Sequence, residues 1–537
     1  MRPVLAVLVL AASLCRAAPP PAAPRCVEIV GTADVHGHLA PEKVDAAGAS
    51  VERGGLPAFG GYLNILRRKY PGAVVLLDGG DLFQGTLPSN LSKGAAVIAA
   101  YNTLGYTATA VGNHEFDFGP DAGAPGLTGA LEKRMAEARF PFLAANLYDR
   151  ATGKRPAWKN FAPSALVQAG GVKVGLIGAI TVDTPNVTTP GNVVGLEFRD
   201  AAPEVLAEAK RLRAQGAELV VLTAHIGGGC GGDPKKLDDV SQCDASSELW
   251  RLLHALPKGT LDAVVAGHTH RYLTKYVDGV AVIESGSYSR SFGWVESCVG
   301  PKGVKTTLKL PTDVCVDTWA EGGCGARDKS AGVKPSKFLG EKIVPDAAVE
   351  KAAAPFLAKV KELEDEPVGV TLAAPLIRTH DAPSAIGHLI AEGLRRGVPG
   401  ASIGVMNAGG IRADLVAGPM RYRQLFELLP FESRVVALRL TGRQVREFVL
   451  APMKAGHGFS QVAGAHVTGG DVVLDDGKPL DDKAEYVLAT NEFLADGGDG
   501  VRAVTSALAK DRKSYVERPM RDVVLDYLKS LPQPLRP

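Results

Sequence analysis

Five short segments of this chain carry side chains that can bind metal ions. Each segment directly follows an apolar, β-branched run of the kind that forms a buried strand. Because the loops after the carboxyl ends of strands line one crevice in an open α/β sheet, these segments should converge. Such a cluster of Asp, Asn and His side chains predicts a metal site with enough ligands for two ions. The segments are Asp34-Val35-His36, Gly80-Asp81, Gly112-Asn113-His114-Glu115, Ala224-His225 and Gly267-His268-Thr269-His270.

A site of this composition has a definite chemistry. Carboxylate, amide and imidazole ligands suit divalent ions such as Mn²⁺, Zn²⁺, Co²⁺ or Fe²⁺. One carboxylate shared by two ions holds them about 3.5–4 Å apart, and the pair activates a bound water and clamps the oxygens of a phosphoryl displacement. Asn113 can bind without adding negative charge, and His114 can be the cationic group that meets the phosphate or the leaving oxygen. The expected reaction is hydrolysis of a phosphate ester.

Two domains should position these residues, because 537 residues are too many for one hydrophobic core. Residues 26–335 alternate strand-like and helix-like runs. Residues 345–366 are expected to form a connecting helix that stops before Pro367, and residues 367–535 a second α/β unit. In that unit we expect helices near 385–396, 423–429 and 442–450, and strands near 403–406, 435–440 and 486–490.

The bulk composition argues against some classes of partner. Apolar residues make up 46% of the chain and charged residues 22%, which is ordinary for a soluble globular protein. The net charge of +2 and the lack of a basic run with interleaved aromatic residues give no support to a nucleic-acid polymer as partner. The expected partner is a small molecule, and the chain is expected to be a monomer or a homodimer.

Residues 1–18 are typical of a signal peptide. Arg2 supplies a positive start, residues 4–14 are apolar, and small residues follow. An apolar run of this length is too short to span a bilayer, and the tail has no hydrophobic anchor. We therefore expect no membrane span and export to the periplasm or the extracellular space. Lipoprotein anchoring through Cys15 is less favoured, because Leu14 is a poor residue for lipoprotein processing.

The cysteines agree with export. Without Cys15 the chain has an even set of cysteines, which in an exported protein suggests disulfides. Two local bridges are the simplest arrangement, and they leave the remaining two cysteines for each other. A zinc ribbon is disfavoured, since no CxxC pair exists. The expected bridges are Cys230–Cys243, Cys315–Cys324 and Cys26–Cys298.

The order DxH, GD, GNHE, a single His and GHxH is similar to the signature of the calcineurin-like metallophosphoesterases. Residues 32–38, 79–85 and 112–117 resemble the 5′-nucleotidase family, in its periplasmic or secreted bacterial type. Residues 407–412 resemble that family's N-x-G-G-I-R, 429–431 its P-F-G-N, and 491–500 its N-x-F-x-x-x-G-G-D-G. The resemblance implies a four-layer αββα sandwich followed by a smaller α/β nucleotide-binding domain. It also implies two divalent metal ions and hydrolysis of nucleotides, above all nucleoside 5′-monophosphates.

Position by position, the resemblance also implies roles in the metal centre. His114 matches the catalytic histidine of the family and Asp117 the carboxylate that orients it. Asp81 would bridge the two ions. His270 is a departure, because several members have Gln or Asn there, so the metal preference could differ. The implied ligands are Asp34, His36, Asp81 and His270 for one ion, and Asp81, Asn113, His225 and His268 for the other.

In the second domain, the resemblance assigns residues to the nucleotide. The assignments are Arg378 and Arg412 for the terminal phosphate, Phe431 and Phe493 for stacking on the base, and Asp499 for the ribose hydroxyls. Residues 430–433 lack the Asn of P-F-G-N, which leaves the base preference open. The other histidines have no ligand spacing; His38 is expected beside the ligands, and His254 and His457 in packing or surface positions.

Several related functions stay open. UDP-sugars or dinucleotides are possible additional substrates. One alternative is a 2′,3′-cyclic-nucleotide 2′-phosphodiesterase with 3′-nucleotidase activity, because relatives of that type also carry GHxH. A thiosulfohydrolase shares the architecture. A nucleotide-binding protein without catalysis is the alternative outside the enzymes, and the complete ligand set argues against it.

Overall fold

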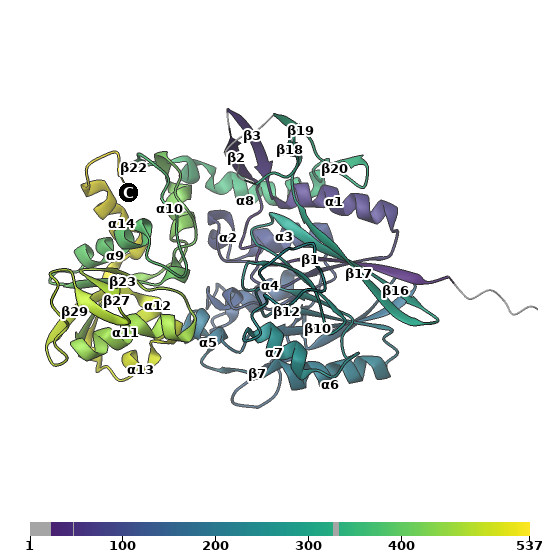
Figure 1. Cartoon of the computed structure of the whole chain (residues 1–537), viewed down its shortest axis with the longest axis horizontal. Helices are drawn as coiled ribbons and strands as arrows, with labels where there is room; N and C mark the ends of the chain where they lie inside the picture. The colour runs from purple at the N-terminus through teal and green to yellow at the C-terminus, as the bar shows by residue number, and fades with distance from the viewer. Residues whose placement is uncertain (1–22, 47, 326–331, 537) are drawn as a thin grey trace, which may run out of the picture.

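The computed structural model describes residues 23–46, 48–325 and 332–536. The expected signal peptide and Cys15 lie outside these ranges. Figure 1 shows two α/β units, with the helix α8 (Ala347–Asp365) running from the first unit to the second. Within the described ranges, every helix is too short or too polar to cross a membrane.

The first unit contains two mixed sheets. In spatial order, the first sheet is β17 (Gly303–Asp313), β16 (Ser291–Gly300), β1 (Arg25–Thr32), β4 (Val74–Asp78), β5 (Ala108–Ala110), β6 (Phe142–Leu143) and β8 (Phe161–Ala162). The second is β14 (Tyr272–Val277), β15 (Val280–Ser285), β13 (Ala263–Ala266), β12 (Leu219–His225), β10 (Val172–Ile180) and β9 (Ser164–Ala169). Every residue of β12 and β13 is buried, as expected for central strands covered on both faces.

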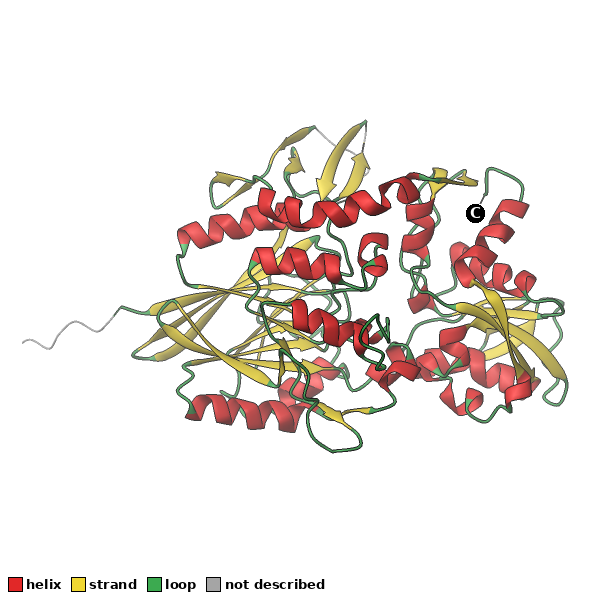
Figure 2. Cartoon of the chain, turned by 180° about the vertical axis from the view of Figure 1, so that it is seen from behind, coloured by secondary structure: helices red, strands yellow, loops and turns green. Residues whose placement is uncertain are grey.

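Helices cover the outer faces of both sheets (Figure 2). α1 (Leu56–Lys69) and α3 (Ala95–Leu104) share one apolar cluster with the first sheet, and α6 (Ala201–Ala214) and α7 (Glu248–Ala255) share another with the second. A third cluster, which includes Ile29 and Val75 opposite Val221 and Val265, fills the space between the sheets. These layers form the αββα sandwich implied by the resemblance, which is confirmed.

Shorter elements complete the first unit. Its remaining helices are α2 (Leu87–Leu91), η1 (His114–Phe116), α4 (Gly129–Glu137), α5 (Thr184–Val187) and η2 (Pro190–Val193). Its hairpins and short pairs are β2 (Glu42–Ala46) with β3 (Ala49–Arg53), β7 (Leu147–Asp149) with β11 (Leu196–Phe198), β18 (Asp317–Trp319) with β19 (Val333–Pro335), and β20 (Lys337–Phe338) with β21 (Glu341–Lys342).

The expectation of a single crevice along one open sheet is corrected in one respect. β1, β4 and β5 belong to the first sheet, whereas β12 and β13 belong to the second. The segments still meet, because both sheets direct the carboxyl ends of these strands to the same end of the sandwich. His225 is the last residue of β12 rather than part of the following loop.

The second unit is built on a five-stranded sheet. Its spatial order is β26 (Gln461–Ala463), β23 (Ile403–Met406), β29 (Glu485–Asn491), β25 (Arg434–Thr441) and β30 (Lys513–Pro519). Its helices are α9 (Ala385–Gly397), η3 (Ala408–Gly410), α10 (Tyr422–Leu428), α11 (Gly442–Ala455), α12 (Glu492–Ala495), η4 (Gly498–Gly500), α13 (Arg502–Thr505), η5 (Lys510–Arg512) and α14 (Met520–Ser530). Two further pairs are β22 (Pro367–Leu372) with β24 (Gly418–Arg421), and β27 (Ala465–Thr468) with β28 (Asp471–Leu474). The six elements expected here from sequence are all present, and α11 extends five residues beyond its expected end.

All three expected disulfides are present. Cys26–Cys298 joins β1 to its antiparallel neighbour β16, across 272 residues of sequence. Cys230–Cys243 and Cys315–Cys324 close local loops with separations of 13 and 9 residues. The long-range bridge lies in the strand that leads to Asp34 and His36.

Candidate metal centre

Two groups of side chains come together at the end of the sandwich. Asp34, His36 and His270 form one group, and Asp81, His225 and His268 form the other. Within each group the ligand atoms all lie within 4.8 Å of one another. The groups follow or end the strands β1, β4, β12 and β13, drawn from both sheets. This is the convergence that the spacing predicted.

The backbone at this site is strained. Five of the six residues have a positive φ, a region that residues other than glycine rarely occupy. Each such residue costs of order 1–3 kcal/mol and persists only where the surrounding structure holds it. The strain is concentrated where the side chains converge, which marks a functional site. The values are 53° for Asp34, 47° for His36, 59° for Asp81, 86° for His268 and 57° for His270.

Asp81 lies between the two groups. Its Oδ2 is 3.1 Å from Nε2 of His225 and 3.6 Å from Nε2 of His36. Asn113 joins the second group, with its Oδ1 2.9 Å from Nε2 of His225. Nε2 of His36 also lies 3.1 Å from Nε2 of His270. Nitrogen and oxygen atoms that converge in this way suit divalent cations, so the donor set fits two ions with one shared carboxylate.

Backbone carbonyls orient two of these imidazoles. Nδ1 of His36 lies 2.6 Å from the carbonyl oxygen of Gln84, and Nδ1 of His225 lies 2.8 Å from that of Gly79. A carbonyl can only accept, so each Nδ1 carries a proton and each Nε2 is the nitrogen that faces the cluster. The backbone thus selects the tautomer that can bind a metal.

The protonation states favour cation binding at three of the four histidines of the cluster. Burial lowers the pKa of His268 to about 3 and holds those of His36 and His270 well below their usual value, which keeps these rings neutral. His225 is different. Burial lowers its pKa, but the stronger effect of the Asp81 carboxylate raises the pKa of His225 to about 10. Metal binding displaces such a proton, so affinity for metal should rise with pH.

His114 and Asp117 form a pair beside the cluster. Nδ1 of His114 lies 2.6 Å from Oδ2 of Asp117, and the backbone N–H of His114 donates to Oδ1 of Asp81 at 2.9 Å. Burial works against the charged ring, but the carboxylates of Asp117 and Asp81 raise the pKa of His114. The two carboxylates therefore favour the cationic imidazole, next to the place where a phosphate would meet the metal ions.

Three positioning groups were not identified from the sequence. Thr188 donates to Oδ1 of Asp117 at 2.8 Å, and Asn192 Nδ2 donates to the carbonyls of Phe116 and Asp117. Both come from the segment after β10, and no local pattern marks them. Glu115 was visible as the last residue of GNHE, but its role depends on contacts with another loop.

Glu115 holds the Asp81 loop in place. Its carboxylate accepts from the backbone N–H groups of Asp81 at 2.9 Å, Leu82 at 2.7 Å, Phe83 at 3.3 Å and Gly112 at 2.7 Å. Burial and the nearby Asp81 carboxylate raise the pKa of Glu115 to about 7, whereas the backbone donors favour the charged form. The residue keeps the strained Asp81 backbone in position without facing the metals.

We expect Glu115→Gln to weaken metal binding by about 10–100-fold, the usual cost of losing a group that orients a ligand. The amide NH₂ would face backbone N–H groups that need an acceptor. Titration of the metal-free protein with Mn²⁺ measures the change. Glu248→Gln is the matched control, because Glu248 also accepts a backbone N–H but from Val182 outside the cluster. Equal affinity in wild type and Glu115→Gln would contradict this role.

The second unit brings Arg412 and Phe431 to the centre. Nη2 of Arg412 lies 3.1 Å from Nε2 of His36, and the ring of Phe431 is 5.7 Å from that of His114. Arg378 behaves differently: among the described residues its hydrogen bonds stay within the second unit, to the carbonyl of Ile411 and the side chain of Asp414. Of the two predicted arginines, both of which the structure describes, Arg412 therefore lies at the metal cluster and Arg378 does not hydrogen-bond to it.

Phe493 lies in α12 and Asp499 in η4, the two short helices that follow β29. Asp499 is buried and accepts from Nδ2 of Asn407 at 2.8 Å, and burial raises its pKa to about 7. The ring of Phe493 packs on Gly498, where an added Cβ would lie 2.3 Å from Cζ of the ring. Only glycine fits there, which explains part of the Gly-Gly-Asp-Gly pattern.

Further contacts join the two units near Asp499. Nδ1 of His457 lies 3.5 Å from Oδ2 of Asp183, and Arg502 donates to the carbonyl of Pro185. His457 was expected in a packing or surface position, and it lies at this seam. His38 packs against Tyr288 at 4.4 Å between ring centroids, beside the ligands as expected.

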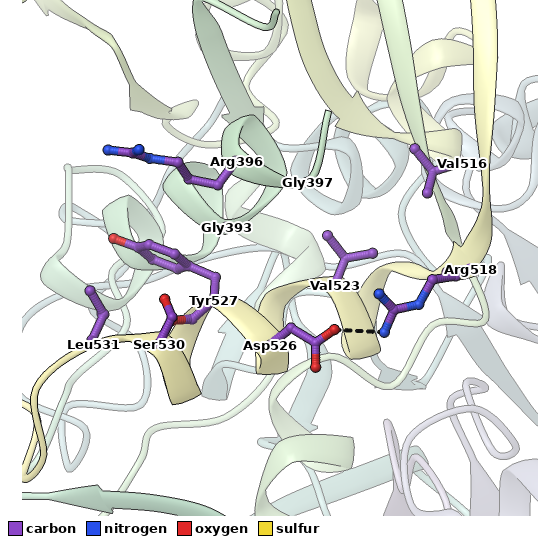
Figure 3. A pocket seen from close by; sticks show the side chains of 10 residues that line it. All are labelled: Gly393, Arg396, Gly397, Val516, Arg518, Val523, Asp526, Tyr527, Ser530 and Leu531. Carbon is purple, nitrogen blue, oxygen red and sulfur yellow. Dashed lines mark hydrogen bonds and ion pairs between the residues drawn. The ribbon is translucent and has the colours of Figure 1, made fainter. Parts of the chain in front are cut away.

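A separate surface pocket of about 500 Å³ lies between α9, β30 and α14 (Figure 3). Val516, Val523 and Leu531 give it apolar walls, and Arg518 pairs with Asp526 at its edge. None of the predicted site residues is among the residues that line it.

Fold and site together define a metal-dependent phosphoesterase. The family model for calcineurin-like phosphoesterases matches residues 27–272, and that for the 5′-nucleotidase C-terminal domain matches residues 367–506. The chain belongs to the 5′-nucleotidase family, and it is a hydrolase of the metallophosphoesterase class.

Its similarity to several other proteins extends over most of its length. Protein UshA of Escherichia coli is 28% identical over 468 residues, which cover 80% of this chain and 78% of UshA. The 5′-nucleotidase of Vibrio cholerae is 26% identical over 502 residues, covering 86% and 83%. The crystal structure of a 5′-nucleotidase precursor from Thermus thermophilus aligns with a TM-score of 0.74 at 25% identity, covering 94% and 96%. Sulfate thiohydrolase SoxB from the same organism shares the fold, with a TM-score of 0.69 at 18% identity over 97% of both chains.

Proposed function

We propose that this protein is an exported phosphatase that hydrolyses nucleoside 5′-monophosphates. The observation that carries the proposal is the meeting of two kinds of residue at one place. Candidate metal ligands from the first unit face Arg412 and Phe431 from the second. A substrate with a phosphate at one end and an aromatic base at the other would use both.

In this proposal seven residues hold two divalent ions, with Asp81 shared. The ions would supply an activated water and stabilise charge on the phosphoryl oxygens. His114, kept cationic by Asp117, would donate a hydrogen bond to the phosphate or protonate the leaving oxygen. The ligands are Asp34, His36, Asp81, Asn113, His225, His268 and His270.

The second unit would bind the rest of the nucleotide. Arg412 is close enough to His36 to reach a phosphate on the metals. Phe431 and Phe493 would stack on the base, a contact that tolerates different bases. Asp499 would accept from the ribose hydroxyls in place of Asn407. Arg378 would have to leave the carbonyl of Ile411 to reach a phosphate.

Export is part of the proposal. Three disulfides are stable in an oxidising compartment and rare in the cytosol. Cleavage of the expected signal peptide can be read directly from the N-terminal sequence of the secreted or periplasmic protein.

One set of assays tests the function. Phosphate release from AMP, 2′,3′-cyclic AMP and UDP-glucose is measured with Mn²⁺ and with a chelator. We expect AMP to be the best substrate and the chelator to abolish the reaction. Preference for 2′,3′-cyclic AMP would favour the cyclic phosphodiesterase instead. Release from none of them with Mn²⁺ present would contradict the proposal and leave a thiosulfohydrolase or a binding protein.

We expect Phe431→Ala and Phe493→Ala each to lower kcat/KM for AMP by an amount equal to about 1–3 kcal/mol, the value of one base–aromatic stack. Neither change should affect p-nitrophenyl phosphate by more than about twofold, because that ester has no base to stack. Tyr515→Ala is the control, because the ring of Tyr515 on β30 contacts Arg434. Equal losses on both substrates would show that the rings do not bind the base.

A further inference from the structure

Asn90 joins the metal loop to the second unit. It is the fourth residue of α2 and only 8% of it is exposed. Its Oδ1 accepts from the backbone N–H of Gly85 at 2.8 Å, and its Nδ2 donates to the carbonyl of Pro430 at 3.0 Å. The two partners are 345 residues apart in sequence, so one side chain connects both halves of the molecule.

The first partner lies in the loop that supplies the metal centre. This loop begins with Asp81, and the carbonyl of Gln84 in it receives the proton of His36 Nδ1. Gly85 follows Gln84 directly, so the bond from its N–H to Asn90 helps to fix the end of the loop. The bond that Asn90 Oδ1 accepts therefore stabilises the first unit and does not involve the second.

The second partner sets the place of Phe431. The carbonyl of Pro430 and the N–H of Phe431 belong to one planar peptide group, so a bond to the carbonyl orients the backbone of Phe431. The ring of Phe431 then lies 5.7 Å from that of His114. Leu87, one turn before Asn90, packs with Val360 of α8 and Phe426 of α10 in a small cluster across the same seam. Figure 1 shows α2 on the side of the first unit that faces α10.

We propose that Asn90 is a positioning residue for nucleotide hydrolysis. Its Nδ2 holds the second unit in the arrangement that places Phe431 beside the metal centre, while its Oδ1 serves the first unit alone. The inference rests on the proposed function, since it concerns a substrate that reaches from the metals to Phe431. An apparent affinity falls in proportion to the fraction of molecules in the competent arrangement.

Asn90→Asp separates the two bonds. The carboxylate still accepts from Gly85, but its second oxygen now faces the carbonyl oxygen of Pro430. A buried acceptor without a donor destabilises the contact, and we expect KM for AMP to rise by about 5–50-fold at pH 8 with kcat changed less than about twofold. Hydrolysis of p-nitrophenyl phosphate should be impaired less than that of AMP, because this ester can lose only the phosphate contact of Arg412 and has no base to stack on Phe431. Asn90→Ser, which removes both bonds without adding charge, should also raise KM for AMP.

Asn102→Asp is the matched control. Asn102 makes the same pair of bonds, from the N–H of Arg139 and to the carbonyl of Glu137, but both partners lie in the first unit. The Asn102→Asp variant should have the same KM for AMP as wild type. An unchanged KM in Asn90→Asp, or an equal loss on p-nitrophenyl phosphate, would overturn the proposal. If Asn90→Asp does not fold, Asn90→Ser is judged by KM for AMP alone, because this variant also loses the Gly85 bond that supports the metal loop. An unchanged KM would overturn the proposal.

Solution scattering separates this inference from the proposed function. We expect Asn90→Asp to have a larger radius of gyration than wild type and Asn102→Asp an unchanged one. If wild type hydrolyses p-nitrophenyl phosphate but not AMP, the nucleotide function fails, and scattering alone then decides the role of Asn90. If AMP is not a substrate, identical scattering of wild type and Asn90→Asp would overturn the proposed role of Asn90.

Discussion

Asp81→Ala is expected to lose both metal ions and to leave a folded protein without phosphatase activity. Oδ2 of Asp81 lies between His225 and His36, one from each group, so its removal takes an anionic ligand from both ions. The rate should fall below about 10⁻⁴ of wild type, because metal-bound water has a pKa near 7 and free water one of 15.7. The fold should survive, since Glu115 binds the backbone N–H at position 81, which alanine keeps.

Metal analysis of the purified variant, together with circular dichroism and phosphate release, measures these effects. Asp78→Asn is the matched control. Asp78 is equally buried and ends the same strand, but its oxygens are bound by Thr32, Tyr101 and the N–H of Gly80. It should keep both ions. Two ions retained by Asp81→Ala would contradict the shared position of this carboxylate.

His114→Ala should separate catalysis from metal binding. The side chain of His114 points to Asp117, and only its backbone N–H contacts Asp81. We expect the variant to bind both ions with wild-type stoichiometry. Its turnover should fall by about 10²–10⁴-fold, the range for a positioned acid–base group.

Steady-state kinetics with AMP and p-nitrophenyl phosphate, alongside metal analysis, test this prediction. The loss should be the same for both substrates if His114 acts on the phosphate they share. It should be larger for AMP if His114 protonates the leaving oxygen, because p-nitrophenolate leaves without a proton. His254→Ala is the control, since His254 is exposed and lies near Asp278 on the outer surface. Turnover close to wild type would remove His114 from the mechanism.

Much of the site could be predicted because each candidate ligand stands next to the strand-like run that positions it in the sequence. Ligand residue types follow directly on strand-like runs, and the order of those runs is visible in the sequence. The disulfides follow from simple pairing of an even set. The sequence does not indicate which sheet each strand joins, because β1 pairs with β16 across more than 250 residues.

The positioning residues illustrate the same limit. Thr188, Asn192 and Asn90 act through partners distant in sequence, and nothing in their neighbours marks them. The end of α11 was placed too early. The helix continues through Pro452 and ends at Ala455, before the left-handed Gly456.

The left-handed backbone at five of the candidate ligands places activity and stability in opposition at those positions. Glycine would adopt these φ values freely, but it has no side chain to bind a metal. Selection for a robust fold alone would therefore favour glycine at the residues on which the chemistry depends. A redesign of this protein that is guided by stability alone and ignores the metals would tend to replace these ligands first.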